Sequence, residues 1–249
     1  MKRSGQAFYA GTSGVALPIP KSGFPPSFQD KSRLHYYASL FNSIEVNSSF
    51  YKLPQASTIT RWKESVGDSF KFTFKLPKAV SHARELQFAE TDVIDFLKVI
   101  NHADDKKGCI LIQFPPRLKV DQFGRVEHLL EIIDQLNTDH SWKIAVEFRN
   151  PSWYIAEIFE TLNHFKAAMV IQDLRAAPTP LTGSTAPFRY LRFHGPEPRY
   201  RGSYSLDFLT TYAGHVRQWI KEGKTVYCYF NNTMGEAVDD LKRMIDLLG

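Results

Sequence analysis

Several short stretches of the chain alternate apolar and polar residues, which is typical of a β-strand with one buried face. Ile44 and Val46, for example, alternate with Glu45 and Asn47. Eight such stretches predict strands, of which the sixth is the weakest: residues 7–13, 43–47, 70–76, 108–114, 143–149, 168–173, 188–194 and 225–231.

A 3.6-residue hydrophobic period predicts helices between most of these strands. The helices span residues 92–104, 126–137, 206–221 and 234–248, with shorter ones over 31–41, 57–66 and 152–165. Alternating strands and helices are typical of a parallel α/β fold. The chain has 249 residues, close to the ~250 of one (β/α)₈ barrel, and neither a repeat nor a linker interrupts it. We therefore predict a single TIM-type barrel domain over residues 1–249, irregular around the sixth strand.

The polar positions of the strands favour a closed barrel over an open sheet. In an open doubly wound sheet both faces of each strand are covered by helices and are apolar. Here one face carries polar side chains, which would point to the barrel axis. Connections that follow strands are often long, at residues 14–30, 77–90, 174–187 and 195–203. Long loops at the carboxyl ends of barrel strands indicate a functional site there.

Composition narrows the setting without naming a function. The formal net charge is +5. This charge could simply keep the protein in solution, or it could indicate a preference for anionic ligands or nucleic acid. Because the chain has no long Lys/Arg run, we favour the first interpretation. Cys109 and Cys228 lie in apolar runs and form no disulfide framework, so we expect inert thiols in a reducing cytoplasm. Residues 1–5 are not followed by a signal-peptide region, and no segment has membrane-spanning length.

The predicted strand ends carry many charged and hydrogen-bonding side chains. An isolated buried charge is costly, so these groups must pair with one another, meet water or bind a ligand. A ring of salt bridges that only holds the barrel top, such as Glu147 with Arg192 or Lys75, is one outcome. The groups are the carboxylates Glu45, Glu147 and Asp173, the cations Lys75, Arg149 and Arg192, and the hydrogen-bonding side chains Asn47, Gln113, His194, Tyr229 and Asn231.

Acid/base catalysis is the chemistry that this set favours. His194 precedes Gly195-Pro196 and could carry protons near neutral pH, with Glu147 or Glu45 as its partner; a histidine bonded only for packing is the alternative. Two carboxylates on different strands could also flank a glycosidic bond. Lys75 could form a Schiff base if desolvated, although an anion-binding role is favoured.

Three further features could bind a ligand. Thr12 and Ser13 end the first strand between glycines and could cradle a phosphate or sugar hydroxyl, or form a tight turn. Aromatic side chains could stack on sugars or bases, or simply close the barrel top. They are Phe50, Tyr51, Trp153, Tyr200 and Tyr204. Arg199 and Arg201 flank Tyr200 in a small basic-aromatic loop that could contact phosphate.

A divalent metal is not favoured as a cofactor. Glu45, Glu147, Asp173 and His194 would suit Mg²⁺ or Mn²⁺. However, the neighbouring lysine and arginines would compete for the same oxygens, and no H-E-x-x-H motif is present.

Six motifs, in order along the chain, resemble those of the YecE-like family, also called domain-of-unknown-function family seventy-two. They are GTSG at 11–14, FNSIEVNSSFY at 41–51, QFPP at 113–116, EFRNPSW at 147–153, RFHG at 192–195 and YFNN at 229–232. The resemblance implies a TIM-type barrel in a bacterial or archaeal cytoplasmic protein, related to sugar isomerases but without an established reaction. Val15 and Asn150 depart from the Trp and His that are frequent in the family.

These features lead us to expect an enzyme that acts on a small polyhydroxylated or phosphorylated ligand by proton transfer, as in an isomerase, with hydrolysis second. One alternative is a nucleic-acid-binding or nuclease-like barrel that uses Arg199, Arg201 and exposed rings. Another is a non-catalytic protein that binds a metabolite in the same funnel.

Overall fold

A computed structural model describes residues 7–181 and 183–249 of the chain. The expectation about residues 1–5, and residue 182 of the expected loop 174–187, lie outside the described residues. Within them, no helix combines the length and the hydropathy needed to cross a membrane.

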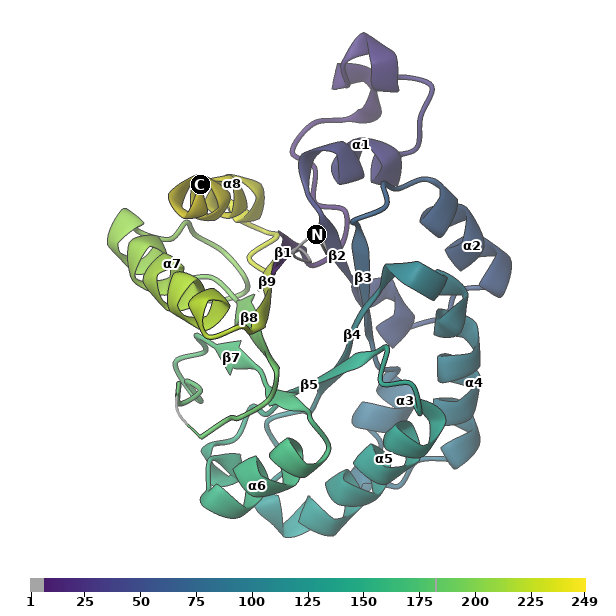
Figure 1. Cartoon of the computed structure of the whole chain (residues 1–249), viewed down its shortest axis with the longest axis vertical. Coiled ribbons are helices and arrows are strands. Elements are labelled where there is room, and N and C mark those ends of the chain that lie inside the picture. The colour runs from purple at the N-terminus through teal and green to yellow at the C-terminus, as the bar shows by residue number, and fades with distance from the viewer. Residues whose placement is uncertain (1–6, 182) are drawn as a thin grey trace.

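In the part of the chain that the structure describes, nine parallel strands form two sheets around a common centre, and the helices lie outside them (Figure 1). One sheet has the order β1-β9-β8-β7 and the other β2-β3-β4-β5-β6. The expected α/β architecture is therefore confirmed. The strands are β1 (Phe8–Thr12), β2 (Ser43–Val46), β3 (Lys71–Lys75), β4 (Lys107–Gln113), β5 (Lys143–Glu147), β6 (Ala168–Met169), β7 (Ile171–Gln172), β8 (Phe188–Phe193) and β9 (Thr225–Phe230).

The two sheets meet at two seams. At one seam, β6 and β7 are separated only by Val170, whose N–H donates to the Val146 carbonyl oxygen at 2.8 Å. The expected sixth strand is thus split between the sheets, which is the irregularity predicted there. At the other seam, a bridge joins Ser13 to Glu45, and the Gly14 N–H donates to the Glu45 carbonyl oxygen at 2.7 Å. The barrel is therefore completed by local contacts at these seams rather than by one continuous ladder.

Close backbone approach at the second seam requires a glycine. A Cβ on Gly11 would lie 2.0 Å from the carbonyl oxygen of Ser43. The Tyr37 hydroxyl accepts from the Thr12 N–H at 2.6 Å and donates to the same Ser43 oxygen at 3.2 Å. This buried phenol supplies hydrogen bonds that a regular β1–β2 ladder would otherwise provide.

The helices follow the predicted order with shifted ends. The expected loop 77–90 contains a short helix, and the expected helix 92–104 ends early and continues as a 3₁₀ segment, Asn101–Lys106. The purple segment before α1 in Figure 1 projects beyond that helix. The α-helices are α1 (Arg33–Leu40), α2 (Ala56–Glu64), α3 (Lys78–Ser81), α4 (Glu90–Ile100), α5 (Phe123–Leu136), α6 (Ala156–His164), α7 (Leu206–Lys221) and α8 (Ala237–Leu248).

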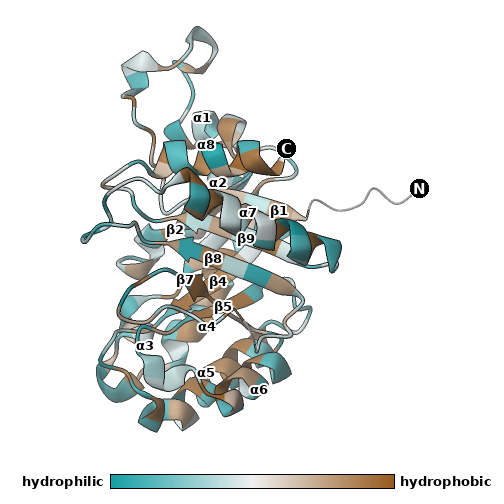
Figure 2. Cartoon of the chain, turned by 90° about the vertical axis from the view of Figure 1, so that its left-hand side faces the viewer, coloured by the Kyte–Doolittle hydropathy of each residue, from teal (hydrophilic) through white to brown (hydrophobic). Residues whose placement is uncertain are grey.

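Two apolar clusters confirm the alternation of the strands. The larger cluster packs the outward faces, for example Phe72, Phe74 and Leu191, under the helices. The smaller cluster contains inward residues such as Leu111 and Tyr227. In Figure 2 the strands run between layers of helices that carry both hydrophilic and hydrophobic residues. The barrel axis is thus apolar at depth, and its charged groups gather at the carboxyl ends of the strands.

Candidate functional site

Arg192 links two glutamates at the carboxyl end of the barrel. Its Nε lies 3.0 Å from both carboxylate oxygens of Glu45, and its Nη2 lies 2.9 Å from Glu45 Oε1. Its Nη1 donates to Glu147 Oε2 at 3.0 Å. All three side chains come from the inward faces of β2, β5 and β8, and none of the three residues is more than 1% exposed. The fork geometry of arginine suits this double engagement.

The two carboxylates stay ionised despite their burial. Burial would raise the pKa of Glu45, but Arg192 and the hydroxyls of Ser13 and Tyr190, each donating at 2.6 Å, hold that pKa below its usual value. Burial likewise opposes ionisation of Glu147, yet Arg192, Arg149 and His194 hold its pKa well below the ordinary range. A carboxylate with a depressed pKa is a weak base, so these groups suit orientation better than proton abstraction.

His194 lies directly after β8, in contact with this network. Its Nε2 is 3.5 Å from Glu147 Oε1, and its Nδ1 is 3.0 Å from Asn231 Nδ2. The Asn231 amide donates to Nδ1 over the shorter distance, which assigns the imidazole proton to Nε2, facing Glu147; Arg192 Nη1 also lies 3.4 Å from Nε2. Burial lowers the pKa of His194 and Glu147 offsets only part of this, so the imidazole is neutral at pH 7. The backbone N–H of His194 donates to Asp173 Oδ1 at 2.8 Å, which fixes the backbone at this position.

Lys75, at the end of β3, is held by neutral groups. Its Nζ donates to Gln113 Oε1 at 2.8 Å and lies 4.1 Å from the centroid of the Phe50 ring. The Gln113 amide is itself oriented, because its Nε2 donates to the Phe114 carbonyl oxygen at 2.8 Å. Burial and the nearby Arg192 lower the pKa of Lys75 to about 8. Near neutral pH, Lys75 therefore carries a proton that it can lose.

A strained loop covers His194. Arg199 and Tyr200 have φ of 63° and 62°, in the left-handed region that costs non-glycine residues roughly 1–3 kcal/mol each. The Tyr200 ring centroid lies 5.8 Å from that of His194, and its hydroxyl is 3.4 Å from Arg149 Nη1. Arg149 Nε in turn donates to Glu147 Oε1 at 2.8 Å. Strain held at a cluster of titratable groups is typical of a functional site.

The carboxylate of Asp240, in α8, anchors the end of this loop. It accepts from Ser203 Oγ at 2.7 Å, from the Tyr204 N–H at 3.2 Å and from Asn232 Nδ2 at 2.8 Å. Tyr204 also donates through its hydroxyl to Asp173 Oδ2. The backbone at His194 is therefore held by Asp173, and the end of the loop is held by the buried Asp240.

The structure does not bring every predicted site residue into this network. The alternation stops at Val46, because a 3₁₀ turn (Asn47–Phe50) follows β2. Asn47 instead lines a separate, mostly apolar cavity of about 260 Å³ together with Val15. Tyr51 is 81% exposed and makes an edge contact with Phe50.

Three other candidates have local structural partners. Trp153 is fully buried, stacks on Phe148 at 4.4 Å and donates to the Leu118 carbonyl oxygen, which leaves no ring face for a ligand. Tyr229 lies deeper in the barrel, with its hydroxyl 2.6 Å from Ser43 Oγ. Thr12 donates to the Gly14 carbonyl oxygen at 2.7 Å within its own turn. Ligand binding by these three residues therefore has no geometric support.

Some groups of the network escaped the sequence analysis. Tyr190 shares the inward face of β8 with Arg192, so the alternation that located the arginine also contained this signal. His82 follows α3 in a segment expected to be a loop, and its ring lies 4.9 Å from that of Phe50. Burial and the nearby Lys75 lower the pKa of His82 to about 4, so this ring is neutral as well.

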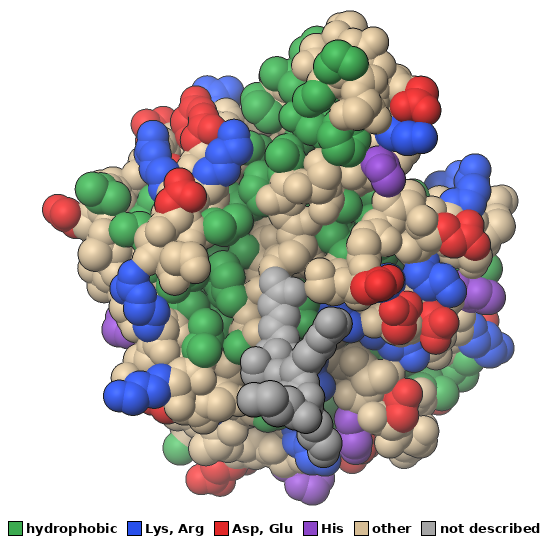
Figure 3. Space-filling view, turned by 45° about the horizontal axis from the view of Figure 1, so that its top comes forward, with side chains coloured by type: hydrophobic (Ala, Val, Ile, Leu, Met, Phe, Trp, Pro, Cys, Tyr) green, Lys and Arg blue, Asp and Glu red, His purple; other side chains and the backbone are tan. Residues whose placement is uncertain are grey.

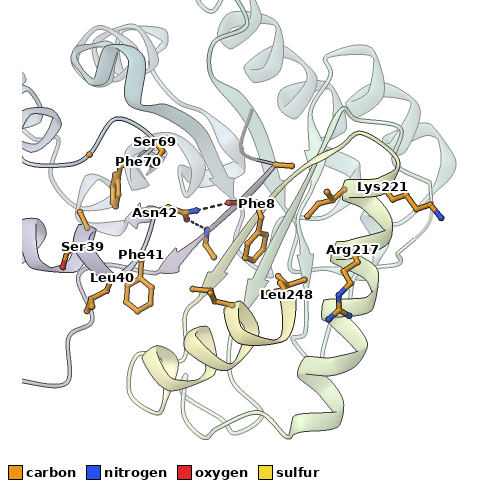
Figure 4. Close-up of a pocket in the computed structure, with 17 residues that line it drawn as sticks. Phe8, Ser39, Leu40, Phe41, Asn42, Ser69, Phe70, Arg217, Lys221 and Leu248 are labelled. Carbon is orange, nitrogen blue, oxygen red and sulfur yellow. Dashed lines mark hydrogen bonds between the residues drawn. The ribbon is translucent and has the colours of Figure 1, made fainter. Parts of the chain in front are cut away.

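Two further cavities differ in their distance from the network: one lies at the same end of the barrel and the other at the opposite end. A cleft of about 580 Å³ at the carboxyl end is lined by Asp173, Arg175, Glu197 and Tyr204, among others. A groove of about 760 Å³ lies at the other end of the barrel, between the starts of strands and the ends of α7 and α8 (Figure 4). Asn42 in this groove already bonds the backbone of β1, at 2.8 and 2.9 Å. The charged network around Arg192 is therefore separate from this groove.

The distribution of charged side chains and thiols is relevant to binding of metal ions and nucleic acid and to thiol reactivity. In residues 7–181 and 183–249, no group of three or more His, Cys, Asp or Glu side chains could hold a metal ion. On the face seen in Figure 3, acidic and basic side chains are interspersed around hydrophobic ones, and no single basic surface forms there. Burial raises the pKa of both Cys109 and Cys228, so neither thiol is activated.

Known sequences relate the chain to proteins of unknown function. A family model described as "Protein of unknown function DUF72" matches residues 9–249. The UPF0759 protein YunF of Bacillus subtilis (strain 168) is 27% identical over 257 residues, which cover 90% of this chain and 89% of YunF. The UPF0759 protein YecE of Escherichia coli (strain K12) is 30% identical over 131 residues, which cover 52% of this chain and 46% of YecE.

Solved structures extend the likeness to the fold. A DUF72 family protein from Enterococcus faecalis V583 has a TM-score of 0.78 at 19% identity, covering 97% of this chain and 95% of that chain. A DUF72 family protein from Thermotoga maritima MSB8 has a TM-score of 0.76 at 23% identity, covering 98% and 99%. D-psicose 3-epimerase, crystallised in the presence of D-fructose, has a TM-score of 0.61 at 13% identity, covering 96% and 95%. At these identities the likeness establishes the fold alone.

Proposed function

The chain belongs to the DUF72 family, as its resemblance to YecE-like proteins predicted, and from this premise we propose that it is an enzyme that epimerises or isomerises a small polyhydroxylated carbonyl compound. The reaction is a proton transfer at a carbon next to the carbonyl group. The structural likeness to a sugar epimerase supports this substrate class, and the groups at the carboxyl end of the barrel support the chemistry.

His194 is the proton carrier in this proposal. The observation that carries it is a neutral, buried imidazole whose two nitrogens are held by Glu147 and Asn231. In the neutral ring the lone pair is on Nδ1, so this nitrogen removes the proton from carbon in place of the hydrogen bond from Asn231, and returns it to the other face or to the neighbouring carbon. Glu147 acts as orienter rather than base, because two arginines keep its pKa low.

The cations stabilise the negative charge that develops on the substrate oxygen. Arg149 keeps part of its side chain exposed, 16%, at the mouth of the site, where it can reach a ligand. Arg192 bonds both glutamates and is only 1% exposed, so its role is to position them. Ser13 and Asn231 would bond substrate hydroxyls from the rim.

An isomerisation assay tests the proposal. Wild-type protein is incubated with aldoses and ketoses, with and without phosphate groups, and the products are identified by NMR. We expect conversion of at least one sugar and a loss of roughly 10²–10⁴-fold in rate in His194→Ala. The matched control is His164→Ala, which removes a histidine from the end of α6, away from the site. Binding of sugars without turnover would favour the metabolite-binding alternative, and equal rates in wild type and His194→Ala would refute the role of His194.

The nucleic-acid alternative has no support in these comparisons. Hydrolysis of a glycosidic bond is also less favoured, because it needs one carboxyl group with a raised pKa as general acid. Both Glu45 and Glu147 have lowered pKa values.

A further inference from the structure

Lys75 has surroundings that differ from those of the other charged groups in the network. Glu45, Glu147, Arg149 and Arg192 are all ion-paired within 3.0 Å. Within the described part of the chain, Lys75 has no carboxylate oxygen within 4.0 Å. Its partners are a neutral amide and an aromatic ring.

We propose that the Lys75 amine is a nucleophile that forms a Schiff base with the carbonyl carbon of an open-chain ketose or aldose. This inference rests on the proposed function for its substrate class, and it changes the role expected for Lys75 from anion binding to covalent catalysis. It is carried by the geometry: an amine at the mouth of the barrel, oriented by Gln113, desolvated by Phe50 and lacking a counter-ion.

The environment favours the free amine that such a reaction needs. An amine is activated by desolvation and by nearby cations, both of which destabilise the ammonium form. Lys75 is 8% exposed, and Arg192 is the charge that acts on it most strongly. With a pKa of about 8, roughly a quarter of Lys75 is unprotonated at pH 7.5, against about one in a thousand for an ordinary lysine.

The covalent steps balance without an oxidant or reductant. The amine nitrogen attacks the carbonyl carbon, its proton passes to the oxygen, and a second proton releases that oxygen as water. The resulting iminium acidifies the adjacent C–H, whose proton His194 accepts to give an enamine. Return of the proton to the other face, followed by addition of water to the iminium, releases the epimer and restores the Lys75 amine.

His194 and Lys75 lie at the same end of the barrel. They extend from the carboxyl ends of β8 and β3, on the inward faces of the barrel. Glu147, Arg149 and Arg192 all act on the protonation of both side chains, so both lie around the same charged network. A substrate whose carbonyl carbon is bound to Lys75 would therefore lie at the end of the barrel that contains His194, the proton carrier.

Reductive trapping tests the proposal. Wild-type protein is incubated at pH 7.5 with dihydroxyacetone and sodium cyanoborohydride, which converts an imine to a stable secondary amine, and modified lysines are quantified by peptide mass spectrometry. Lys71 is the matched control, since it lies on the same face of the same strand at the other end and is half-buried, with its Nζ bonded to the Asp105 carbonyl oxygen at 2.6 Å. We expect Lys75 to be modified at least about tenfold faster than Lys71.

Two variants complete the test. Lys75→Arg keeps the positive charge and should abolish sugar turnover. Gln113→Glu places a carboxylate beside the amine, favours the ammonium form and should slow trapping at pH 7.5 by about tenfold or more, with recovery at higher pH. This second variant also keeps the proposal testable if Lys75→Arg does not fold.

The outcomes separate this inference from the proposed function. Modification of Lys75 no faster than that of Lys71, or full turnover by Lys75→Arg, would overturn the Schiff base while a His194-dependent isomerisation stood. Rapid trapping at Lys75 in a protein that converts no sugar would support the nucleophile and count against the isomerisation.

Discussion

Replacement of Arg192 by leucine is the perturbation whose effect can be worked out most directly. The substitution removes every hydrogen bond of the guanidinium while keeping an apolar side chain under the barrel mouth. Glu147 keeps Arg149 as a partner at 2.8 Å, but Glu45 keeps only the hydroxyls of Ser13 and Tyr190. Glu45 thus becomes a fully buried carboxylate without a cation.

The expected destabilisation is large. Loss of one partner of a buried ion pair costs about 3–5 kcal/mol. For a chain of this size each kcal/mol lowers the melting temperature by roughly 2–4 °C, so Arg192→Leu should lower it by roughly 6–20 °C at pH 7.5. Without the arginine, burial raises the pKa of Glu45 above its unfolded value, so the variant should regain stability as the pH falls through that raised pKa. The wild type should change little between pH 7.5 and 5 and lose stability only below about pH 4.5, because carboxyl groups with lowered pKa values keep their stabilising contribution above the unfolded pKa.

Thermal unfolding followed by circular dichroism at pH 7.5 and pH 5 measures both effects. Adding Glu45→Gln to Arg192→Leu removes the unpaired charge and should recover part of the loss at pH 7.5. Arg125→Leu, at an exposed position of α5, is the control and should shift the melting temperature by little. A shift of less than about 3 °C for Arg192→Leu, or no recovery in the double variant, would refute the reasoning.

Three further predictions concern the seam, the pH profile and the loop. Gly11→Ala should lower the melting temperature by several degrees because its methyl group would meet a backbone oxygen at 2.0 Å, whereas Gly124→Ala, with open space around it, should not. Glu147→Gln should move the acidic limb of the pH–rate profile to lower pH, since the carboxylate raises the pKa of His194; an unmoved limb would exclude that coupling. Asp240→Asn should speed amide hydrogen exchange, measured by mass spectrometry, in the loop that it anchors without a comparable change in α4. Unchanged exchange in the loop, or an equal increase in α4, would contradict this role.

Strand alternation predicted the centre of the site, because a period of two decides which side chains share the barrel axis. Glu45, Glu147, Arg192 and His194 were placed together on this basis, and they are in contact. Helical periodicity predicted the bounds of α7, residues 206–221, where a serine cap begins the helix. The roles assigned to these residues stay predictions.

Interactions between distant segments could not be predicted in the same way. Asn47 does not point to the barrel axis as expected, because the chain turns into a 3₁₀ helix at this residue. Trp153 does not lie at the barrel mouth, because Phe148 and the Leu118 carbonyl oxygen hold it in the core. The sequence also gives no sign that Lys75 lacks a counter-ion, since that depends on which carboxylates Arg192 occupies. Geometry of this kind arises only when the strands are packed.

Proton exchange at carbon tests the central claim most directly. The protein is incubated in D₂O with each sugar that it binds, and NMR follows deuterium at the carbon next to the carbonyl group. Our account predicts deuterium uptake at that carbon in wild type, and loss of the uptake in His194→Ala with the fold intact. Uptake at the same rate in His194→Ala, or none from any bound sugar in wild type, would contradict it.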